Sequence, residues 1–190
     1  MDGSSGYEAI ASEFLRQRSN GIGAQEVRNW ARTLPRGSSV LDLGCGSGIP
    51  LTSVLVDENL DVFGVDGAPS LVDAFRKNLP GTPILCEAVQ TSSLFHRSFD
   101  AVLAWGLMFL LDAEDQHCLI QRIAEVLVPN GRLLFTSPAD AVVWRDAMTG
   151  TQSVSLGAEM YRSLLGAAGI YVKSECQDEG QNHYFDAYRG

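Results

Sequence analysis

Short apolar runs alternate along the chain with longer stretches in which apolar residues recur every three or four positions. The short runs are typical of buried strands and the longer spacing of amphipathic helices. The strand-like runs are SSVLDL (38–43), DVFGVD (61–66), TPILCE (82–87), FDAVLAW (99–105) and GRLLFTS (131–137). The helix-like stretches are IPLTSVLVDEN (49–59), APSLVDAFRKNL (68–79), AEDQHCLIQRIAEVL (113–127) and SLGAEMYRSLLGAAG (155–169). This alternation predicts an α/β fold in which helices cover both faces of a parallel sheet.

The two ends of the chain depart from this alternation. IYVKSEC (170–176) and HYFDAYR (183–189) both have strand character, and the link QDEGQN between them is too short for a crossover helix. We therefore predict a Rossmann-like, doubly wound, mostly parallel seven-stranded sheet with a C-terminal antiparallel hairpin and the strand order 3-2-1-4-5-7-6. Helices are also expected in YEAIASEFLRQR and AQEVRNWART. We interpret residues 1–190 as one domain, with an N-terminal helical cap (1–36) and a sheet-and-helix core (37–190).

Composition and charge narrow the range of partners. The chain has 190 residues, of which 45% are hydrophobic, and this is enough for one domain with a full core. Its 14 basic and 23 acidic residues give a formal net charge of −9. Proteins that bind nucleic acid need clustered Lys and Arg, so no nucleic-acid partner is expected. No apolar run approaches the roughly 20 residues of a membrane span. We expect a cytoplasmic protein without a membrane partner, as a monomer or homodimer.

The four cysteines give no sign of a metal or disulfide framework. They lie far apart at positions 45, 86, 118 and 176, and no C-x-x-C pair occurs. Structural zinc sites and disulfide scaffolds use closer, paired spacings. No metal site is therefore predicted.

The stretch VLDLGCGSGIP (40–50) places glycines at positions 44, 46 and 48, directly after the first predicted strand. A glycine-rich turn between a strand and a helix lets the backbone and the helix N-terminal amides approach a ligand closely. The nicotinamide fingerprint is G-x-G-x-x-G, and here Ile49 stands where its third glycine should be. The pattern therefore favours another adenosine-containing cofactor over a dinucleotide.

Acidic residues lie at or near the ends of the first three predicted strands, at Asp42, Asp66 and Glu87. Asp66 follows Gly44 by about 20 residues, which is the spacing of a carboxylate that accepts hydrogen bonds from ribose hydroxyls. Ligands of such sheets bind at the carboxyl edge of the strands. A purely structural turn would not explain these three acids.

At this point the sequence resembles a known family, the class I S-adenosylmethionine-dependent methyltransferases, in their small, single-domain form. VLDLGCGSG resembles the first motif of that family and GVDGAPSLV its ribose-binding second motif. CEAVQTSSLF resembles the adenine-binding stretch, and FDAVLAWGLMFLL the strand and loop beneath the methionine portion. AEVLVPNGRLLFT resembles the helix, turn and strand that follow. The resemblance extends from about Tyr7 to the end of the chain and is most specific in its first half.

The resemblance implies S-adenosyl-L-methionine as the cofactor, with S-adenosyl-L-homocysteine as the product, and a set of residues that would hold it. The glycine turn would pass under the methionine and ribose, Asp66 would take the ribose hydroxyls, and Glu87 would face the adenine amino group. Arg16 or Arg18 could meet the methionine carboxylate, or could belong to a solvated helix face. The implied cofactor-binding residues are Tyr7, Asp42, Gly44, Cys45, Gly46, Ser47, Gly48, Asp66, Gly67, Ala68, Glu87, Ala88, Val89, Ala104, Trp105 and Gly106.

The acceptor would bind where two further segments reach the same edge of the sheet. One is the link 177–183 between the last two strands, and the other is the loop after LLFTSP, which carries VVWRDAMTG. His183 is the only histidine placed there, and its intrinsic pKa suits a base; alternatively, it caps a hairpin turn. The candidate catalytic residues are His183, Asp146, Glu179, Trp144 and Tyr184.

The expected function is methyl transfer to an oxygen, nitrogen or sulfur atom of a small metabolite. The strand end AWGLMF lacks the Asn/Asp-Pro-Pro-aromatic element of family members that methylate nucleobase amino groups, and also the Pro-Cys pair of the cytosine-carbon enzymes. The alternatives are a cofactor-binding regulatory module, a protein-methylating enzyme and an NAD(P)-dependent oxidoreductase. The last lacks the Tyr-x-x-x-Lys pair of short-chain dehydrogenases.

Overall fold

A seven-stranded sheet forms the centre of the computed structural model, which describes residues 4–17 and 21–190. Its strand order is β3-β2-β1-β4-β5-β9-β8. Neighbours from β3 to β5 are parallel, and β9 is antiparallel to both β5 and β8. The strands are β1 (Ser39–Leu43), β2 (Asp61–Asp66), β3 (Ile84–Cys86), β4 (Phe99–Ala104), β5 (Leu127–Thr136), β8 (Ile170–Gln177) and β9 (His183–Arg189). The predicted mostly parallel sheet and its C-terminal antiparallel hairpin are confirmed.

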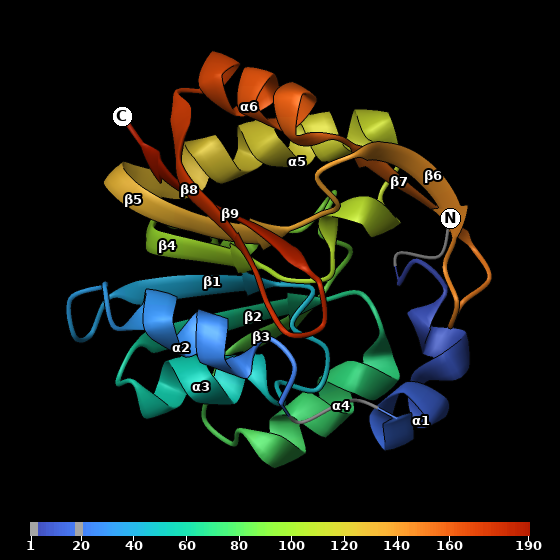
Figure 1. Cartoon of the computed structure of the whole chain (residues 1–190). Helices are drawn as coiled ribbons and strands as arrows, with labels where there is room; N and C mark the ends of the chain where they lie inside the picture. Colours follow the sequence, from blue (N-terminus) through green and yellow to red (C-terminus); the bar gives the residue numbers. More distant parts are fainter. Residues whose placement is uncertain (1–3, 18–20) are drawn as a thin grey trace.

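Helices cover the two faces of this sheet (Figure 1). On one side lie α2 (Ala24–Ala31), α3 (Leu51–Asp57) and α4 (Pro69–Asn78); on the other lie α5 (Ala113–Val126) and α6 (Ala158–Ala167). Short 3₁₀ turns occur at η1 (Leu94–His96) and η2 (Met108–Leu110). Because both faces are covered, every residue of the central strand β1 is buried.

Aromatic side chains fill the core beneath α6. Phe135 of β5 and Phe185 of β9 are fully buried and stack with ring centroids 4.6 Å apart, and Tyr161 of α6 packs edge-on against both. Burial of such large apolar side chains stabilises the fold by about 1.5–3 kcal/mol each. The strand β9 is thereby fixed beside β5. Because β9 is antiparallel to β5, the β8–β9 turn that precedes it lies at the carboxyl edge of the parallel strands.

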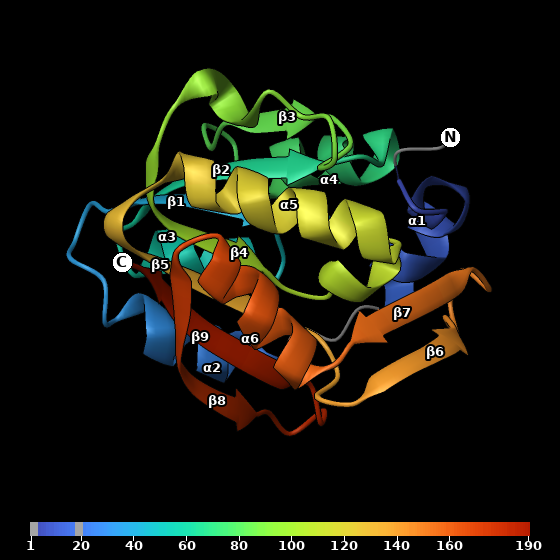
Figure 2. The same ribbon diagram turned by 90° about the horizontal axis from the view of Figure 1, so that it is seen from above.

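A second, two-stranded sheet between β5 and α6 was not predicted. It consists of β6 (Ala141–Arg145) and β7 (Gln152–Leu156), which pair antiparallel. VVWRDAMTG was expected to form a loop, and this expectation was wrong for its first half, since residues 142–145 lie in β6. The segment forms strands because it contains β-branched and small residues, although four of the five β6 residues are exposed. The ribbon projects from the sheet toward the N-terminal segment (Figure 2).

The N-terminal helix α1 (Tyr7–Gln17) lies apart from the central core. Its Ala11 packs with Ala68 and Leu71 of the α4 region, and Tyr7 and Phe14 pack on this cluster. The Glu8 carboxylate also accepts hydrogen bonds from the backbone N–H and the hydroxyl of Ser70, at 2.9 and 2.7 Å. These contacts hold α1 beside the carboxyl edge of the sheet. Within the described ranges, no helix is both long and apolar enough to cross a membrane.

Candidate functional site

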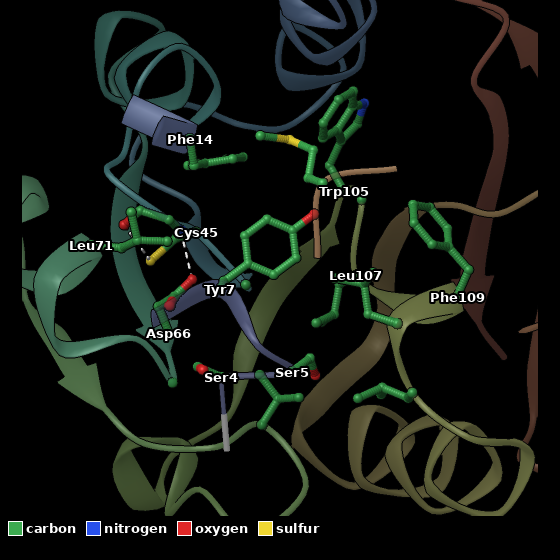
Figure 3. A pocket seen from close by; sticks show the side chains of 18 of the residues that line it. Ser4, Ser5, Tyr7, Phe14, Cys45, Asp66, Leu71, Trp105, Leu107 and Phe109 are labelled. Atoms are coloured by element: carbon green, nitrogen blue, oxygen red, sulfur yellow. Dashed lines mark hydrogen bonds between the residues drawn. The ribbon is translucent and has the colours of Figure 1, made fainter. Parts of the chain in front are cut away.

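A cavity of about 200 Å³ opens at the carboxyl edge of the parallel strands, between α1 and the turn of the β6–β7 ribbon (Figure 3). The ring of Tyr7 lies across it, between Asp66 and Leu71 on one side and Leu107 on the other. The lining residues are Ser4, Ser5, Tyr7, Phe14, Gly44, Cys45, Gly46, Ser47, Ile49, Asp66, Gly67, Leu71, Val89, Gln90, Trp105, Gly106, Leu107, Phe109, Leu110, Leu111, Asp146, Met148 and Asn182.

The turn after β1 forms one wall of the cavity. Gly44, Gly46 and Gly48 all have positive φ angles, of 68°, 56° and 80°. The backbone N–H groups of Gly44 and Cys45 both donate to the Val65 carbonyl, which ties the turn to the end of β2. A side chain at Gly48 would lie 2.6 Å from Leu79 and 2.9 Å from Phe75. The turn therefore needs glycine at position 48 both for its conformation and for its packing.

Asp66, the last residue of β2, faces this turn. Its carboxylate accepts hydrogen bonds from the backbone N–H groups of Gly46 and Ala68, each at 2.8 Å. The side chain is buried, and burial raises the pKa of the Asp66 carboxyl above its usual value. A carboxylate in this position can accept further hydrogen bonds from a ligand, which would replace the lost hydration.

Two other groups support the turn from below. Asp42 is buried and accepts a 2.7 Å hydrogen bond from the Thr52 hydroxyl of α3. Burial, followed by the negative charges of Asp42 and Asp66, raises the pKa of the Cys45 thiol well above its usual value. Cys45 is therefore a neutral packing residue at neutral pH. Asp42 lies under the turn and does not line the cavity.

Glu87, for which the family resemblance implied a contact with the adenine amino group, is not among the described residues that line the cavity. Its carboxylate accepts hydrogen bonds from the hydroxyl of Ser92 and the N–H of Ser93, at 2.7 and 2.8 Å, and these bonds lower its pKa. Gln90 lines the cavity instead, held by a 3.1 Å hydrogen bond from its side-chain amide to Asp115. The Gln90 Oε1 atom is buried and has no hydrogen-bond partner among the described residues. Its place three residues after Glu87, in the same loop, was the only signal for it in the sequence.

A chain of buried hydrogen bonds fixes the side of the cavity opposite the glycine turn. The indole N–H of Trp105 donates to the Tyr184 hydroxyl at 2.6 Å, and this hydroxyl donates to Asp178 at 2.8 Å. Burial raises the pKa of Tyr184, so the hydroxyl stays protonated. Tyr184 thus lies behind Trp105, outside the lining, and orients the indole that lines the cavity.

Two hairpin turns supply further side chains to the cavity lining. Asp146 and Met148 come from the β6–β7 turn, and Asn182 comes from the β8–β9 turn. Trp144 lies one step further out and packs on the lining residue Phe109, with ring centroids 5.5 Å apart. Glu179 is exposed at the tip of the β8–β9 turn and does not reach the lining.

His183 lies outside the lining, at the start of β9. Its Nε2 atom is 2.8 Å from the Glu175 carboxylate on the neighbouring strand, and its ring packs edge-on against Phe185. The structure thus places it as a strand-pairing residue behind the turn. Its role as a base stays a prediction, which turnover measurements on His183→Ala would test.

The cavity brings together part of the residue set derived from the sequence. The predicted residues that line it are Tyr7, Gly44, Cys45, Gly46, Ser47, Asp66, Gly67, Val89, Trp105, Gly106 and Asp146. Those that lie behind or beside it are Asp42, Gly48, Ala68, Glu87, Ala88, Ala104, Trp144, Glu179, His183 and Tyr184. Arg16 is exposed on α1, and Arg18 lies outside the described residues. The apolar lining residues Phe14, Leu71, Leu107, Phe109, Leu110, Leu111 and Met148 were missed, because an apolar residue in a loop looks the same whether it packs in the core or faces a ligand.

A segment of the chain that includes the glycine turn and Asp66 matches a known protein family. Residues 40–131 match the family described as methyltransferase domain. An uncharacterized methyltransferase of Mycobacterium tuberculosis is 41% identical over 97 residues, which are 50% of this chain and 37% of the relative. A tRNA U34 carboxymethyltransferase of Hahella chejuensis is 29% identical over 115 residues, or 55% of this chain and 35% of the relative. The chain thus spans little more than a third of the length of these curated relatives.

Comparison with solved structures extends the similarity to the whole chain. The magnesium protoporphyrin IX methyltransferase of Synechocystis, crystallised with S-adenosylhomocysteine, superposes with a TM-score of 0.79 at 14% identity and covers 100% of both chains. At this identity the likeness shows the fold. The fold of this chain is therefore one that binds S-adenosylhomocysteine in that protein.

Proposed function

We propose that the chain is a class I S-adenosylmethionine-dependent methyltransferase, and that it transfers a methyl group from S-adenosylmethionine to an oxygen, nitrogen or sulfur atom of a small metabolite. S-adenosylmethionine supplies the methyl group on a positively charged sulfur and leaves as S-adenosylhomocysteine. The acceptor atom attacks the methyl carbon in line with the breaking carbon–sulfur bond. The protein's contribution is to hold the two reactants in this alignment and to exclude water.

The observation that carries this proposal is the pairing of the glycine turn with Asp66. Between Gly44 and Ser47 the backbone is open to the cavity, and a Cβ at Gly44 would lie 3.1 Å from Leu107. The Asp66 carboxylate lies at the end of the adjacent strand and is already held by two backbone N–H groups. This arrangement suits the ribose hydroxyls of an adenosyl group and leaves the turn to pass beneath its methionine portion.

The other end of the cavity suits an adenine ring. Leu71, Val89 and Leu111 offer apolar surface to its faces. The buried, unpartnered Gln90 Oε1 is an acceptor that matches the exocyclic amino group of adenine. We propose that Gln90 takes the role that the family resemblance implied for Glu87.

A small-molecule acceptor is proposed on charge and on the shape of the cavity. The formal net charge of −9 disfavours a polyanionic substrate, which weighs against the tRNA acceptor named for one relative. The fold relative from Synechocystis is named for a small-molecule acceptor. The acceptor side of the cavity, between Trp105 and the β6–β7 turn, is enclosed by side chains on several elements.

Thermal unfolding with and without ligand tests the proposal. A ligand at about 100 times its dissociation constant stabilises the folded protein by ~2.7 kcal/mol, so S-adenosylhomocysteine should raise the melting temperature and NADH should not. Asp66→Ala should abolish most of this shift, while Asp140→Ala, an exposed acid outside the lining, should keep it. Stabilisation by NADH alone, or an Asp66→Ala variant with undiminished affinity, would refute the proposal.

A further inference from the structure

The described residues of the cavity lining include acidic side chains but no basic ones. Of the lining residues that the structure describes, two carry a charge at neutral pH, Asp66 and Asp146, and both are acidic. None of them is Lys, Arg or His. Asp66 lies beside the glycine turn, whereas Asp146 comes from the β6–β7 ribbon, which packs through Trp144 on the lining residue Phe109. An acceptor that carries a carboxylate or phosphate would find no cation there and would meet the Asp146 carboxylate.

Asp146 has one carboxylate oxygen committed to its own turn and one available. Its Oδ1 accepts hydrogen bonds from the backbone N–H groups of Met148 and Thr149, at 3.1 and 2.7 Å, and from the Thr149 hydroxyl at 2.8 Å. Its Oδ2 accepts none from any described residue. The first oxygen therefore fixes the side chain, and the second is left to accept from a ligand.

Asn182 presents a second acceptor in the same way. Its side-chain NH₂ group donates to both oxygens of Asp178, at 3.1 and 2.9 Å, and its backbone N–H donates to Oδ1 of the same residue. An ionised carboxylate can only accept, so these bonds fix which end of the amide is the NH₂ group. The Asn182 Oδ1 atom therefore remains available, with no donor to it among the described residues.

Aromatic and thioether groups complete this side of the cavity. Trp105 and Phe109 line it, the latter backed by Trp144, and Met148 lies on the ribbon turn. The indole of Trp105 is held in place by Tyr184 (Figure 3 shows Trp105 and Phe109 on one side of the cavity). Aromatic faces next to a carboxylate are suited to a cation with an apolar substituent.

We infer that the methyl acceptor is a small amine with an apolar or aromatic substituent, held through its N–H groups by Asp146 and Asn182. The inference rests on the proposed function and narrows its acceptor from three atom types to nitrogen. Two available oxygens, together with the lack of a basic side chain among the described lining residues, favour a ligand that donates hydrogen bonds and carries positive charge. Asp146 is the residue that selects it.

The reaction of an amine also gives the carboxylate a function during transfer. The bound ammonium first gives up a proton to solvent water. The free amine then attacks with its lone pair, the nitrogen–carbon bond forms, and the electron pair of the carbon–sulfur bond passes to sulfur. Positive charge thus moves from sulfur to nitrogen, and the methylammonium product gives up a proton to solvent water. A fixed carboxylate beside the nitrogen stabilises this developing charge. A thiolate or alkoxide acceptor would instead begin negatively charged and be repelled.

Binding of three matched probes tests the inference. The protein is saturated with S-adenosylhomocysteine, and 2-phenylethylamine, 2-phenylethanol and phenylacetate are then titrated by calorimetry. These compounds share one skeleton and differ in ammonium, hydroxyl and carboxylate groups. We expect measurable binding of the amine and affinity at least about ten-fold weaker for the other two. Equal or tighter binding of the alcohol or the carboxylate would overturn the inference, as would the failure of the amine to bind.

A variant pair separates the charge of Asp146 from its role in the turn. Asp146→Asn keeps an oxygen for the turn donors and removes the negative charge; Asp140→Asn makes the same change at an exposed position outside the lining. We expect Asp146→Asn to weaken amine binding and labelled-methyl transfer to amines about ten-fold or more, with affinity for S-adenosylhomocysteine unchanged. Asp140→Asn should behave as the unmodified protein does.

The outcomes distinguish failure of the proposed methyltransferase function from failure of the amine acceptor alone. Loss of S-adenosylhomocysteine binding in the unmodified protein would refute the proposed function itself. Normal binding of this compound, combined with methyl transfer to alcohols or thiols in place of amines, would refute only the amine acceptor. Unchanged amine binding by Asp146→Asn would remove Asp146 from acceptor recognition.

Discussion

Single residues determine the shape of the cofactor side, and Gly48 is the sharpest case. We expect Gly48→Ala to destabilise the protein by about 2–4 kcal/mol, because the new Cβ meets Leu79 and Phe75 and the φ angle of 80° is unfavourable for alanine. Denaturant unfolding measures this loss. Gly37 has a similar φ of 76° but no atom within 4 Å of its would-be Cβ, so Gly37→Ala should lose only the conformational part, about 1 kcal/mol. Equal losses in both variants would show that packing against the turn does not matter.

The direction in which a single side chain points was the least predictable feature. Glu87 and Gln90 lie in one loop, and both can accept a hydrogen bond from an amine. The loop closes on itself through the Ser92 and Ser93 donors, which capture Glu87 and leave Gln90 to the cavity. The sequence indicated which loop borders the cavity, whereas competition among nearby hydrogen-bond donors determined which residue of that loop lines it.

At the scale of elements, the β6–β7 ribbon is anchored by a buried polar network. The Tyr161 hydroxyl of α6 donates to Gln116 of α5 at 2.7 Å, and the Gln116 amide donates to the Val154 carbonyl of β7 at 2.8 Å. These bonds connect the ribbon to both helices on its side of the sheet. The ribbon is therefore a fixed part of the cavity wall at its base, and it carries Asp146 at its tip.

The β8–β9 hairpin is anchored by Tyr184, and this gives a prediction at the same scale. Tyr184→Phe removes the hydroxyl between Trp105 and Asp178 and leaves both buried groups without this partner. We expect a loss of about 1–3 kcal/mol in the free energy of unfolding. Tyr188→Phe, a half-exposed tyrosine on the same strand, is the matched control and should lie within about 0.5 kcal/mol of the unmodified protein. A Tyr184→Phe variant as stable as the control would show that the chain of hydrogen bonds is not important for folding.

At the scale of the whole molecule, the net charge governs what can approach the cavity. With a formal charge of −9, the protein should not bind tRNA even at about 50 mM salt, where electrostatic binding is strong. Fluorescence anisotropy of labelled tRNA, with and without S-adenosylhomocysteine, measures this. Binding that weakens steeply as salt rises would point to a basic patch and to a nucleic-acid acceptor.

The sequence by itself determined the central sheet, the helices that cover it and the glycine-turn side of the cavity. Strands and helices alternate with distinct hydrophobic periods, and connections between parallel strands leave few possible orders. The glycines and Asp66 lie at strand ends, which such a sheet necessarily brings to one edge. The location of Gly44 and Asp66 therefore followed from local pattern and topology alone.

Only the tertiary structure decided which residues from the ribbon and the C-terminal hairpin line the cavity. Asp146, Asn182 and Trp105 come from three separate segments, and their meeting depends on how the ribbon and the C-terminal hairpin pack on the sheet. Packing also pairs His183 with Glu175 and turns it away from the cavity lining. Local sequence cannot encode such choices, because they depend on which distant donors, acceptors and apolar surfaces compete for each side chain.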